Sequence, residues 1–277
     1  MDQGDAEMEE DVFNAFEHQG WERLAQPYHA YYASLTGQSH GALLDAFDVR
    51  PDSRFLDVAS GPGYLAAAAA QRGADVTGVD VAEAMVEYAR GLYPSLTFRV
   101  GSAEDLPFAD GSFDAVGISF GLFHFARPEK ALAETFRMLR PGGRVAFTVW
   151  AAADKAIGLG MVLKAIEAHG QLDVGLPEGP PFFRFSNWCE CERVLLDAGF
   201  VEQHVRQVDQ TWHIRAPETP LHALMRGGVR IAAVLKAQTP DAFALIEKAV
   251  MEIATAYRND EEFQVPMPCV LASARKP

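Results

Sequence analysis

The chain has 277 residues, 49% of them hydrophobic, and its formal net charge at pH 7 is −14. This length and hydrophobic content suffice for one large α/β domain, with or without an inserted cap. The acidic balance argues against a nucleic-acid partner or an anionic membrane surface, because such partners are bound through a surplus of Lys and Arg.

The sequence carries no recognisable targeting or membrane segment. No apolar stretch reaches the ~18 residues that a membrane-spanning helix requires, and no signal peptide is apparent. Three cysteines are an odd and low count, typical of a reducing cytoplasm without structural disulfides. Cys189 and Cys191 fall on different sides of a helix, which favours packing over a metal pair. We therefore expect a cytoplasmic protein with no metal and no membrane partner.

The N-terminal region predicts helices that cover a ligand site. Residues 1–11 include six acids and predict a frayed, solvated start. Aromatic and leucine residues recur at helical spacing over residues 13–35, which predicts two helices with one aromatic face. This face either packs on the core or covers the mouth of a site, with Trp21 in its wall. A third helix over 41–47 ends at a turn over 50–52.

The stretch 54–73, RFLDVASGPGYLAAAAAQRG, predicts a strand, a glycine turn and a helix. The mostly apolar run 55–58 is typical of a buried strand. Gly61 and Gly63 then permit a tight turn. Alanine and leucine dominate the helix over 65–71, and Gly73 ends it in a left-handed conformation. The turn leaves backbone N–H groups free for a ligand at the helix N-terminus.

Two acids indicate which ligand this turn binds. GPGYLA also fits the dinucleotide pattern G-x-G-x-x-A. Asp57, however, ends the first strand, where its carboxylate would repel a pyrophosphate and attract a cationic group such as an ammonium. Asp80 ends the second strand, over 76–80, where an acid can accept both ribose hydroxyls. An ammonium and a ribose together indicate S-adenosylmethionine (SAM).

Four ordered motifs then carry a family resemblance, strong over about residues 50–150. LDVASGPG, VTGVD, GSAEDLPFADGSFDAV and LRPGGRV resemble the class I SAM-dependent methyltransferases, and are most similar to the small-molecule branch that includes the ubiquinone/menaquinone-biosynthesis enzymes. The resemblance implies a Rossmann-like α/β fold. Its seven-stranded, mostly parallel sheet would have an antiparallel last strand, helices on both faces, and a helical cap or lid.

The resemblance also implies a set of SAM-binding residues. A tyrosine of the N-terminal cover meets the SAM carboxylate, and Tyr28 is our choice over Tyr32. Met85, in the helix over 81–93, either touches adenine or packs in the core. Ala103 and Glu104 follow the strand over 96–100 and meet adenine, unless this loop is only a solvated acidic turn. The implied set is Tyr28, Asp57, Ala59, Gly61, Gly63, Asp80, Val81, Met85, Ala103, Glu104 and Ser119.

The segment after the fourth strand, over 113–120, predicts the catalytic region. It reads FGLFHF, where relatives often have leucine followed by two histidines. His124 is a candidate general base for a hydroxyl or an acidic carbon, or else a packing histidine. Arg127 replaces an Asp that is common in relatives at the start of the next helix. A turn over 140–143 leads to a fifth strand, over 145–150, that ends at Trp150 near the ligand.

The second half predicts the specificity elements. Helices are expected over 156–170, 186–198 (capped by Ser186), 219–236 and 240–257, with strands over 201–214 and 266–274. The loop over 175–185 is rich in Phe, Pro and Gly, so Phe182, Phe183 and Phe185 either wall the pocket or dock on the N-terminal helices. Arg226 and Ile231 come near the site if the helices fold back as a cap. The predicted pocket is formed by Trp21, Phe120, Phe123, His124, Trp150, Phe182, Phe183 and Met225.

These elements predict four regions and one leading function. The regions are an N-terminal cover (1–49), a SAM-binding core (50–152), a lid insertion (153–186) and the remaining core (187–277), with a helical insertion at about 217–260. The leading function is methyl transfer from SAM to O, N or C of a small, largely apolar metabolite. The alternatives are a cyclisation or other non-methyl step that retains SAM, a non-catalytic SAM-binding regulator, and a nicotinamide oxidoreductase.

Overall fold

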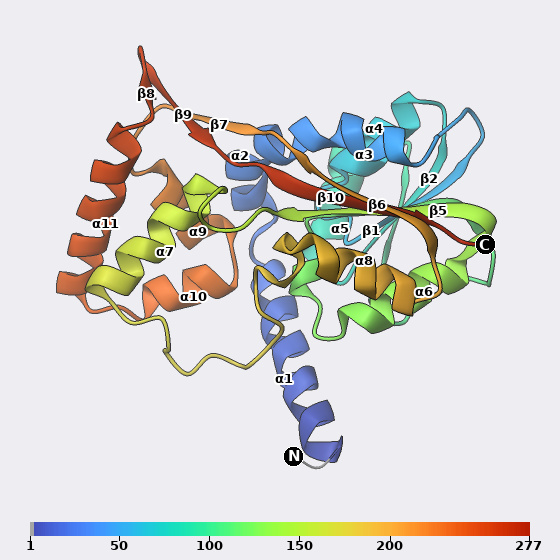
Figure 1. Cartoon of the computed structure of the whole chain (residues 1–277), viewed down its shortest axis with the longest axis horizontal. Coiled ribbons are helices and arrows are strands. Elements are labelled where there is room, and N and C mark those ends of the chain that lie inside the picture. Colours follow the sequence, from blue (N-terminus) through green and yellow to red (C-terminus); the bar gives the residue numbers. More distant parts are fainter. Residues whose placement is uncertain (1–2) are drawn as a thin grey trace.

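The computed structural model describes residues 3–277, which are built around a seven-stranded sheet (Figure 1). The strand order is β3-β2-β1-β4-β5-β10-β6. The neighbours from β3 to β5 are parallel, and β10 is antiparallel to both β5 and β6. This confirms the predicted Rossmann-like sheet with an antiparallel last strand. The strands are β1 (Arg54–Val58), β2 (Asp75–Asp80), β3 (Thr97–Val100), β4 (Phe113–Ser119), β5 (Leu139–Trp150), β6 (Val201–Val208) and β10 (Cys269–Arg275).

Helices cover both faces of this sheet. A buried cluster that includes Leu43, Phe55, Leu65 and Val86 joins three of the helices to one face. In Figure 1 two of these, α3 and α4, lie above the sheet, while α6 and α8 lie below it. The helices are α3 (His40–Ala46), α4 (Tyr64–Gln71), α5 (Glu83–Leu92), α6 (Pro128–Met138) and α8 (Trp188–Asp197). The sheet is therefore buried on both faces, and a ligand can reach it only at its ends.

The remaining elements form a cap beyond the carboxyl ends of β1 and β4. In Figure 1 α7, α9, α10 and α11 lie together at the left, while α1 projects downward. The elements are α1 (Gln3–Trp21), α2 (Ala25–Thr36), α7 (Ile157–His169), α9 (Thr219–Gly227), α10 (Arg230–Lys236) and α11 (Pro240–Thr255), the sheet of β7 (Thr211–Ile214), β8 (Arg258–Asn259) and β9 (Glu262–Pro266), and the short helices η1 (Gly37–Ser39), η2 (Leu122–His124) and η3 (Arg184–Ser186). None of the described helices is long and apolar enough to cross a membrane.

The prediction of a frayed acidic start is wrong for residues 3–11, and residues 1 and 2 lie outside the described part of the chain. Helix α1 begins at Gln3. Glu10 and Asp11 lie 3.5 Å from the guanidinium of Arg127, which fixes this part of α1 to the core.

Several boundaries in the second half differ from the predictions. The predicted strand over 201–214 is two strands in different sheets, because Gln210 is buried at the bend and its Nε2 donates to Leu35 O at 2.7 Å. The predicted helix over 219–236 breaks between α9 and α10, where a Cβ on Gly227 would lie 2.8 Å from the Tyr32 ring. Asn187 caps α8 in place of Ser186, and accepts from Cys189 N at 3.0 Å.

Two strand boundaries also differ from the predictions. The turn predicted over 140–143 lies within β5, where the register with β4 shifts. The last strand begins at Cys269, because Pro266 ends β9 of the smaller sheet. These differences leave the order of the main elements unchanged.

Candidate cofactor and substrate site

A cavity of about 330 Å³ lies where the main sheet meets the cap. It is lined by most of the predicted cofactor residues: Tyr28, Asp57, Ala59, Gly61, Asp80, Val81, Met85, Ala103, Glu104 and Ser119. It is also lined by most of the predicted substrate residues: Trp21, Phe120, Phe123, His124, Trp150 and Phe182. Among the described residues, the predicted Gly63, Phe183 and Met225 lie outside this lining. Asp57 and Asp80 therefore share one crevice, as their positions at the ends of adjacent parallel strands imply.

The backbone at this crevice is held in uncommon conformations. Gly61 and Gly63 have φ angles of +49° and +85°. Ala59 and Phe120, which follow β1 and β4, both have φ of +54°, which is costly for residues with a Cβ. Such strain clusters at functional sites, and both residues line the cavity.

Gly63 supports the site from behind rather than from its wall. A Cβ there would lie 2.6 Å from the Phe98 ring, whereas a Cβ on Gly61 would meet nothing within 4 Å. Both Gly63→Ala and Gly61→Ala force alanine into the left-handed region, at about 1–2 kcal/mol each. We expect Gly63→Ala to lower the free energy of unfolding by ~1–3 kcal/mol more than Gly61→Ala, because it alone overpacks. Urea unfolding of both variants measures this, and equal losses would contradict it.

Asp57 is the most deeply buried acid of the site. Its side chain is 1% exposed, and its Oδ2 accepts from the N–H of Ala66 at 2.9 Å. Its Oδ1 is buried without a hydrogen-bond partner among the described residues. Burial, together with the nearby charge of Asp80, raises the pKa of Asp57 to about 8. A buried carboxylate oxygen without a donor is suited to bind a cation.

Asp80 links β2 to the glycine turn. Its Oδ2 accepts from the N–H of Gly61 at 2.8 Å, and its Oδ1 accepts from Ala82 at 3.0 Å. Burial raises the pKa of Asp80, and these two N–H groups act against the rise. A carboxylate oxygen can accept more than one hydrogen bond, so Asp80 retains capacity for ligand hydroxyls.

Arg127 binds the loop after β3, which is the loop predicted to meet adenine. The backbone N–H of Arg127 donates to Glu104 Oε1 at 3.0 Å, and its Nε donates to Oε2 at 2.6 Å. Arg127 does not cap α6 with its side chain but ties the loop after β3 to the start of that helix. The Glu104 carboxylate is thus engaged by Arg127, and its contact with adenine stays a prediction.

Stacked tyrosines border the cavity on the side of α2. The rings of Tyr28 and Tyr32 stack with centroids 5.2 Å apart. Burial raises the pKa of Tyr28 to about 12, so its hydroxyl remains a hydrogen-bond donor at neutral pH. Both tyrosines line the cavity, so the choice of Tyr28 for a carboxylate contact stays a prediction.

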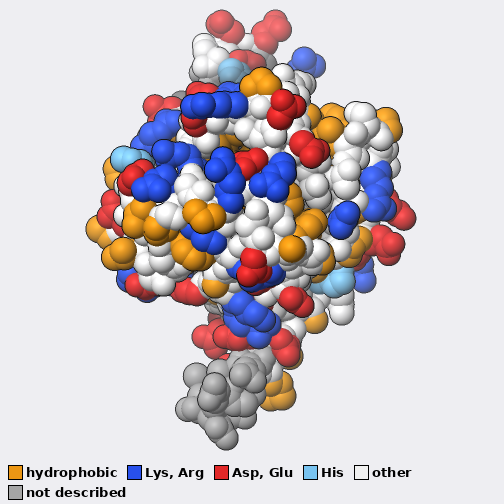
Figure 2. All heavy atoms as spheres, turned by 90° about the vertical axis from the view of Figure 1, so that its right-hand side faces the viewer, with side chains coloured by type: hydrophobic (Ala, Val, Ile, Leu, Met, Phe, Trp, Pro, Cys, Tyr) orange, Lys and Arg blue, Asp and Glu red, His pale blue; other side chains and the backbone are white. Residues whose placement is uncertain are grey.

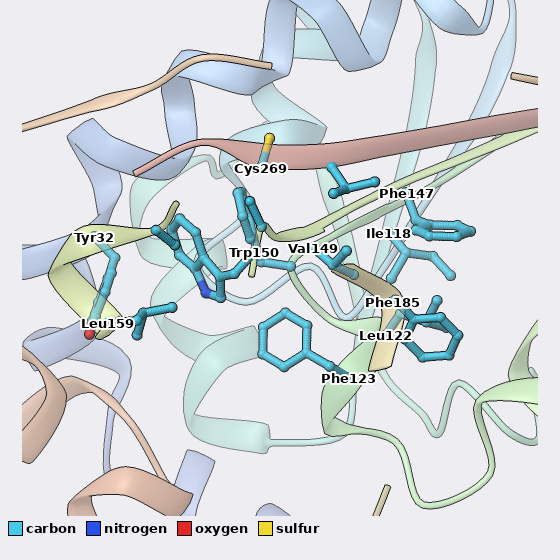
Figure 3. Packing of buried hydrophobic residues seen from close by; sticks show 14 of the residues in the cluster. Tyr32, Ile118, Leu122, Phe123, Phe147, Val149, Trp150, Leu159, Phe185 and Cys269 are labelled. Carbon is cyan, nitrogen blue, oxygen red and sulfur yellow. The ribbon is translucent and has the colours of Figure 1, made fainter. Parts of the chain in front are cut away.

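The rest of the wall is mostly aromatic. The rings of Phe120 and Trp150 lie 4.2 Å apart, and those of Phe123 and Phe182 lie 4.7 Å apart. Figure 3 shows Tyr32, Leu159, Trp150 and Phe123 on one side of the packed interior, with Phe185 beyond them. Phe185 is buried in the core 6.3 Å from the Phe147 ring, so its interpretation as pocket wall is wrong.

The structure adds wall residues that the sequence analysis missed: Glu17, His40, Tyr64, Leu159, Leu224 and Arg230. Glu17 Oε2 lies 3.0 Å from both His124 Nδ1 and Trp21 Nε1, and its Oε1 accepts from Arg230 Nε at 2.9 Å. The spacing of four residues between Glu17 and Trp21 was the one available signal, because it puts both on one helix face.

Burial lowers the pKa of His40 to about 4, so that ring is neutral.

No metal site is visible in the described part of the chain, where no three His, Cys, Asp or Glu side chains are grouped to hold an ion. Cys189 is exposed and Cys191 is buried, and both are free thiols. The main components of the candidate site are its carboxylates, the glycine turn, His124 and the aromatic wall.

Comparison with known proteins agrees with this geometry. Residues 56–147 match the family described as methyltransferase domain. The demethylmenaquinone methyltransferase of Beutenbergia cavernae is 47% identical over 104 residues, which are 38% of this chain and 43% of that protein. The chain thus matches less than half the length of that relative.

Two solved structures share the fold at low sequence identity. Phosphoethanolamine N-methyltransferase 2 of Haemonchus contortus, in complex with S-adenosyl-L-methionine, superposes with a TM-score of 0.53 at 20% identity, covering 86% of this chain and 52% of that one. The cyclase SpnF superposes with a TM-score of 0.51 at 21% identity, covering 87% of this chain and 80% of that one. Residues 56–147 are therefore similar to a methyltransferase domain, and the fold of the chain agrees with that match.

Proposed function

We propose that this chain is a SAM-dependent methyltransferase acting on an O, N or C atom of a small, largely apolar molecule. The observation that carries the proposal is the pair of buried acids, Asp57 and Asp80, that meet the glycine turn in one cavity. The unpartnered Oδ1 of Asp57 fits an ammonium, and Asp80 fits a ribose diol. The match of residues 56–147 to a methyltransferase domain supports the same ligand.

SAM, when bound, would supply a methyl group on a cationic sulfur. Asp57 would hold its ammonium, Asp80 its ribose, and the segments around Val81, Met85 and Ala103 its adenine. Tyr28 would donate to its carboxylate. The chain's own contribution is orientation and exclusion of water, which can lower a barrier by roughly 7–11 kcal/mol.

The composition of the wall supports an apolar acceptor. Phe120, Phe123, Trp150, Leu159 and Phe182 offer no charge to a ligand beside them. His124 lies beside this aromatic wall, with its ring 4.4 Å from that of Phe123. A flat molecule with one ionisable group suits such a pocket, and His124 would act there as a general base.

The acidic net charge of the chain, −14, favours a small-molecule partner over a nucleic acid. Figure 2 shows Lys and Arg side chains gathered among acidic ones on the face at the amino ends of the parallel strands. Arg54 and Arg140 both pair with Asp114, and Arg144 and Arg275 both pair with Glu202. These four arginines share two acids, so this face keeps a small local surplus of positive charge within an acidic chain. The expectation of no nucleic-acid partner stays a prediction.

Two experiments test the proposed function against its alternatives. A thermal-shift comparison of SAM, its demethylated by-product S-adenosylhomocysteine and NAD should raise the melting temperature for the first two only, because ligands stabilise the folded state that binds them. Turnover with methyl-labelled SAM should then place label in an acceptor. Turnover without label would favour a cyclisation or other non-methyl reaction, and stabilisation by NAD alone would favour an oxidoreductase.

Asp80→Ala tests the ribose assignment. The variant removes an acceptor of one or two hydrogen bonds from SAM, each worth about 1.5–3 kcal/mol because the acceptor is charged. Titration calorimetry should therefore show weaker SAM binding. Asp75→Ala, an exposed acid at the start of the same strand, is the matched control and should bind like the wild type. Unchanged affinity in Asp80→Ala would overturn the assignment.

A further inference from the structure

Three polar side chains meet at the join between the cap and the core. Glu17 comes from α1, His124 from η2 and Arg230 from the first residue of α10. Glu17 is 4% exposed, and each of its carboxylate oxygens has a charged or titratable partner within 3.0 Å. Burying a carboxylate away from water costs free energy unless the group is fully paired. The complete pairing of Glu17 therefore indicates that this arrangement has a role.

The arrangement fixes which nitrogen of His124 carries the proton. Although burial opposes ionisation, the charges and hydrogen bonds of His124 and Arg230 hold the pKa of Glu17 below its ordinary value. An ionised carboxylate only accepts hydrogen bonds, so His124 donates Nδ1–H across the 3.0 Å contact. When the His124 ring is neutral, Nε2 is therefore its unprotonated nitrogen, on a residue that lines the cavity.

The groups packed around His124 hold the ring in this orientation. The Trp21 ring meets it edge-on with centroids 4.9 Å apart, and Phe182 lies on another side at 6.2 Å. Trp21 Nε1 also donates to Glu17 Oε2 at 3.0 Å. Of the charged and titratable groups near His124, Glu17 contacts its ring at 3.0 Å, Arg230 contacts Glu17 at 2.9 Å, and His18 also lines the cavity.

We infer that Glu17 is a positioning residue that makes His124 a general base, and that the acceptor therefore carries a weakly acidic X–H group such as a hydroxyl. The inference rests on the proposed function and deepens it. An acceptor that is already anionic, or an amine with a free lone pair, would not need a base. The carboxylate–histidine pair selects for acceptors that must lose a proton during transfer.

His124 Nε2 takes the proton from X–H, and the lone pair on X forms a bond to the methyl carbon. SAM would supply the methyl group, and the electron pair of the broken carbon–sulfur bond would remain on its sulfur, which would become neutral. The imidazolium that forms lies against the Glu17 carboxylate, and its proton then leaves to solvent.

The first test measures which tautomer of His124 is present, and it does not require enzyme activity. Long-range proton–nitrogen NMR spectra of the full ¹⁵N-labelled chain report which ring nitrogen is protonated, with His124 assigned from the His124→Gln variant. We expect Nδ1–H in the wild type, and a mixture of both tautomers in Glu17→Gln. Glu9→Gln, an exposed acid of α1, is the matched control and should leave the His124 signals unchanged. A wild-type ring protonated on Nε2 would overturn the inference.

The second test is kinetic, with the acceptor that takes up label from methyl-labelled SAM. General bases contribute ~10²–10⁴-fold. Partners that orient a metal-ligating histidine contribute ~10–100-fold, and we take this range as the guide for Glu17. We expect Glu17→Gln to lower kcat by about 10–100-fold with little change in KM, and Glu17→Asp to restore part of the loss. The loss should shrink above the pH at which the acceptor itself ionises.

The outcomes separate this inference from the proposed function. A thermal shift with SAM establishes that each variant is folded, and Glu17→Asp provides a second variant if Glu17→Gln is not. An unchanged kcat in a folded Glu17→Gln would overturn the inference while leaving methyl transfer intact. A wild type that labels no acceptor would instead overturn the proposed function, and the tautomer experiment would still decide the pairing of Glu17 with His124.

Discussion

Replacing Asp57 with Asn should weaken SAM binding by about 2–5 kcal/mol, which is ~30- to ~5,000-fold in affinity. The buried Oδ1 has no donor among the described residues, so the ammonium of SAM would be its main partner. Asn keeps the volume and can still accept from Ala66 N–H through one oxygen. It removes the negative charge and turns an N–H₂ group toward a cation.

Calorimetry above pH 8, where Asp57 is ionised before SAM binds, measures this loss most cleanly. Asp52→Asn is the matched control, because Asp52 is exposed and its φ of +68° suits asparagine. The control should bind SAM like the wild type. If both variants do so, the cationic end of the ligand does not lie at Asp57.

The same residue gives SAM binding a pH dependence of defined sign. Burial raises the pKa of Asp57 from 3.8 to about 8. Between these values the free protein holds a proton that a bound cation would expel. Binding at neutral pH should therefore release about one proton, seen as different calorimetric heats in buffers of different ionisation enthalpy. Asp57→Asn should abolish this release.

The stability of the free protein should show the matching trend. Because the folded pKa of Asp57 exceeds the unfolded one, the folded state binds the extra proton between pH 4 and pH 8. Its contribution is most favourable below the unfolded pKa and is lost as the pH rises through the folded value. The wild type should therefore lose more stability than Asp57→Asn over this interval.

The cofactor half of the site could be predicted because its signals are local. A short apolar run, two glycines and an alanine-rich helix define the turn within twenty residues, and β1 and β2 are joined by one crossover. Adjacent parallel strands carry their last residues to the same edge. Asp57 and Asp80 could therefore be assigned to one crevice without knowledge of any long-range contact.

The substrate half could not be predicted in the same way, because its contacts join distant segments. Glu17 lies 107 residues from His124 and 213 from Arg230 along the chain. Neither helical nor strand periodicity reports which acid meets which histidine over such separations. The two neighbouring glycines at 227 and 228 are compatible with a break in a helix, but they do not indicate that α9 approaches the Tyr32 ring there.

The sequence shows that Arg127 replaces an aspartate common in relatives, but it does not show which residues the arginine side chain contacts. Arginine in place of an expected aspartate removes a helix cap, and the structure uses the side chain to bind Glu104, with Glu10 and Asp11 nearby. The substitution thus exchanges a local contact for one that ties α1 to the adenine side of the cavity. Such a contact cannot be predicted from the sequence, because it depends on where α1 lies in the fold.

Replacing Arg230 with Met should lower the free energy of unfolding of the cap by about 3–5 kcal/mol, the loss expected when one partner of a buried ion pair is removed. Its Nε holds Glu17, while its two terminal nitrogens donate to Pro180 O and Phe123 O at 2.7 Å each. Its guanidinium also lies 4.4 Å from the centre of the Phe13 ring. One side chain therefore joins α1, η2, α10 and the loop over 175–185.

The effect should appear first as local opening of these segments. Hydrogen exchange followed by mass spectrometry should show faster exchange in α1, α10 and residues 175–185 than in β1 or β4, because local unfolding costs less than global unfolding. Arg226→Met is the matched control, since Arg226 is an exposed arginine of the neighbouring α9. It should change stability by no more than about 0.5 kcal/mol.

A double variant separates loss of the ion pair from loss of the backbone contacts. In Glu17→Leu/Arg230→Met the buried charge is gone, and apolar replacement of a buried pair is often neutral for stability. The double variant should therefore be more stable than the sum of the single variants predicts, with a coupling of about 0.5–3 kcal/mol. Strict additivity would mean that the two side chains act independently. In that case the cap would be held by the arginine's contacts to Pro180 and Phe123, and Glu17 would be paired mainly with His124.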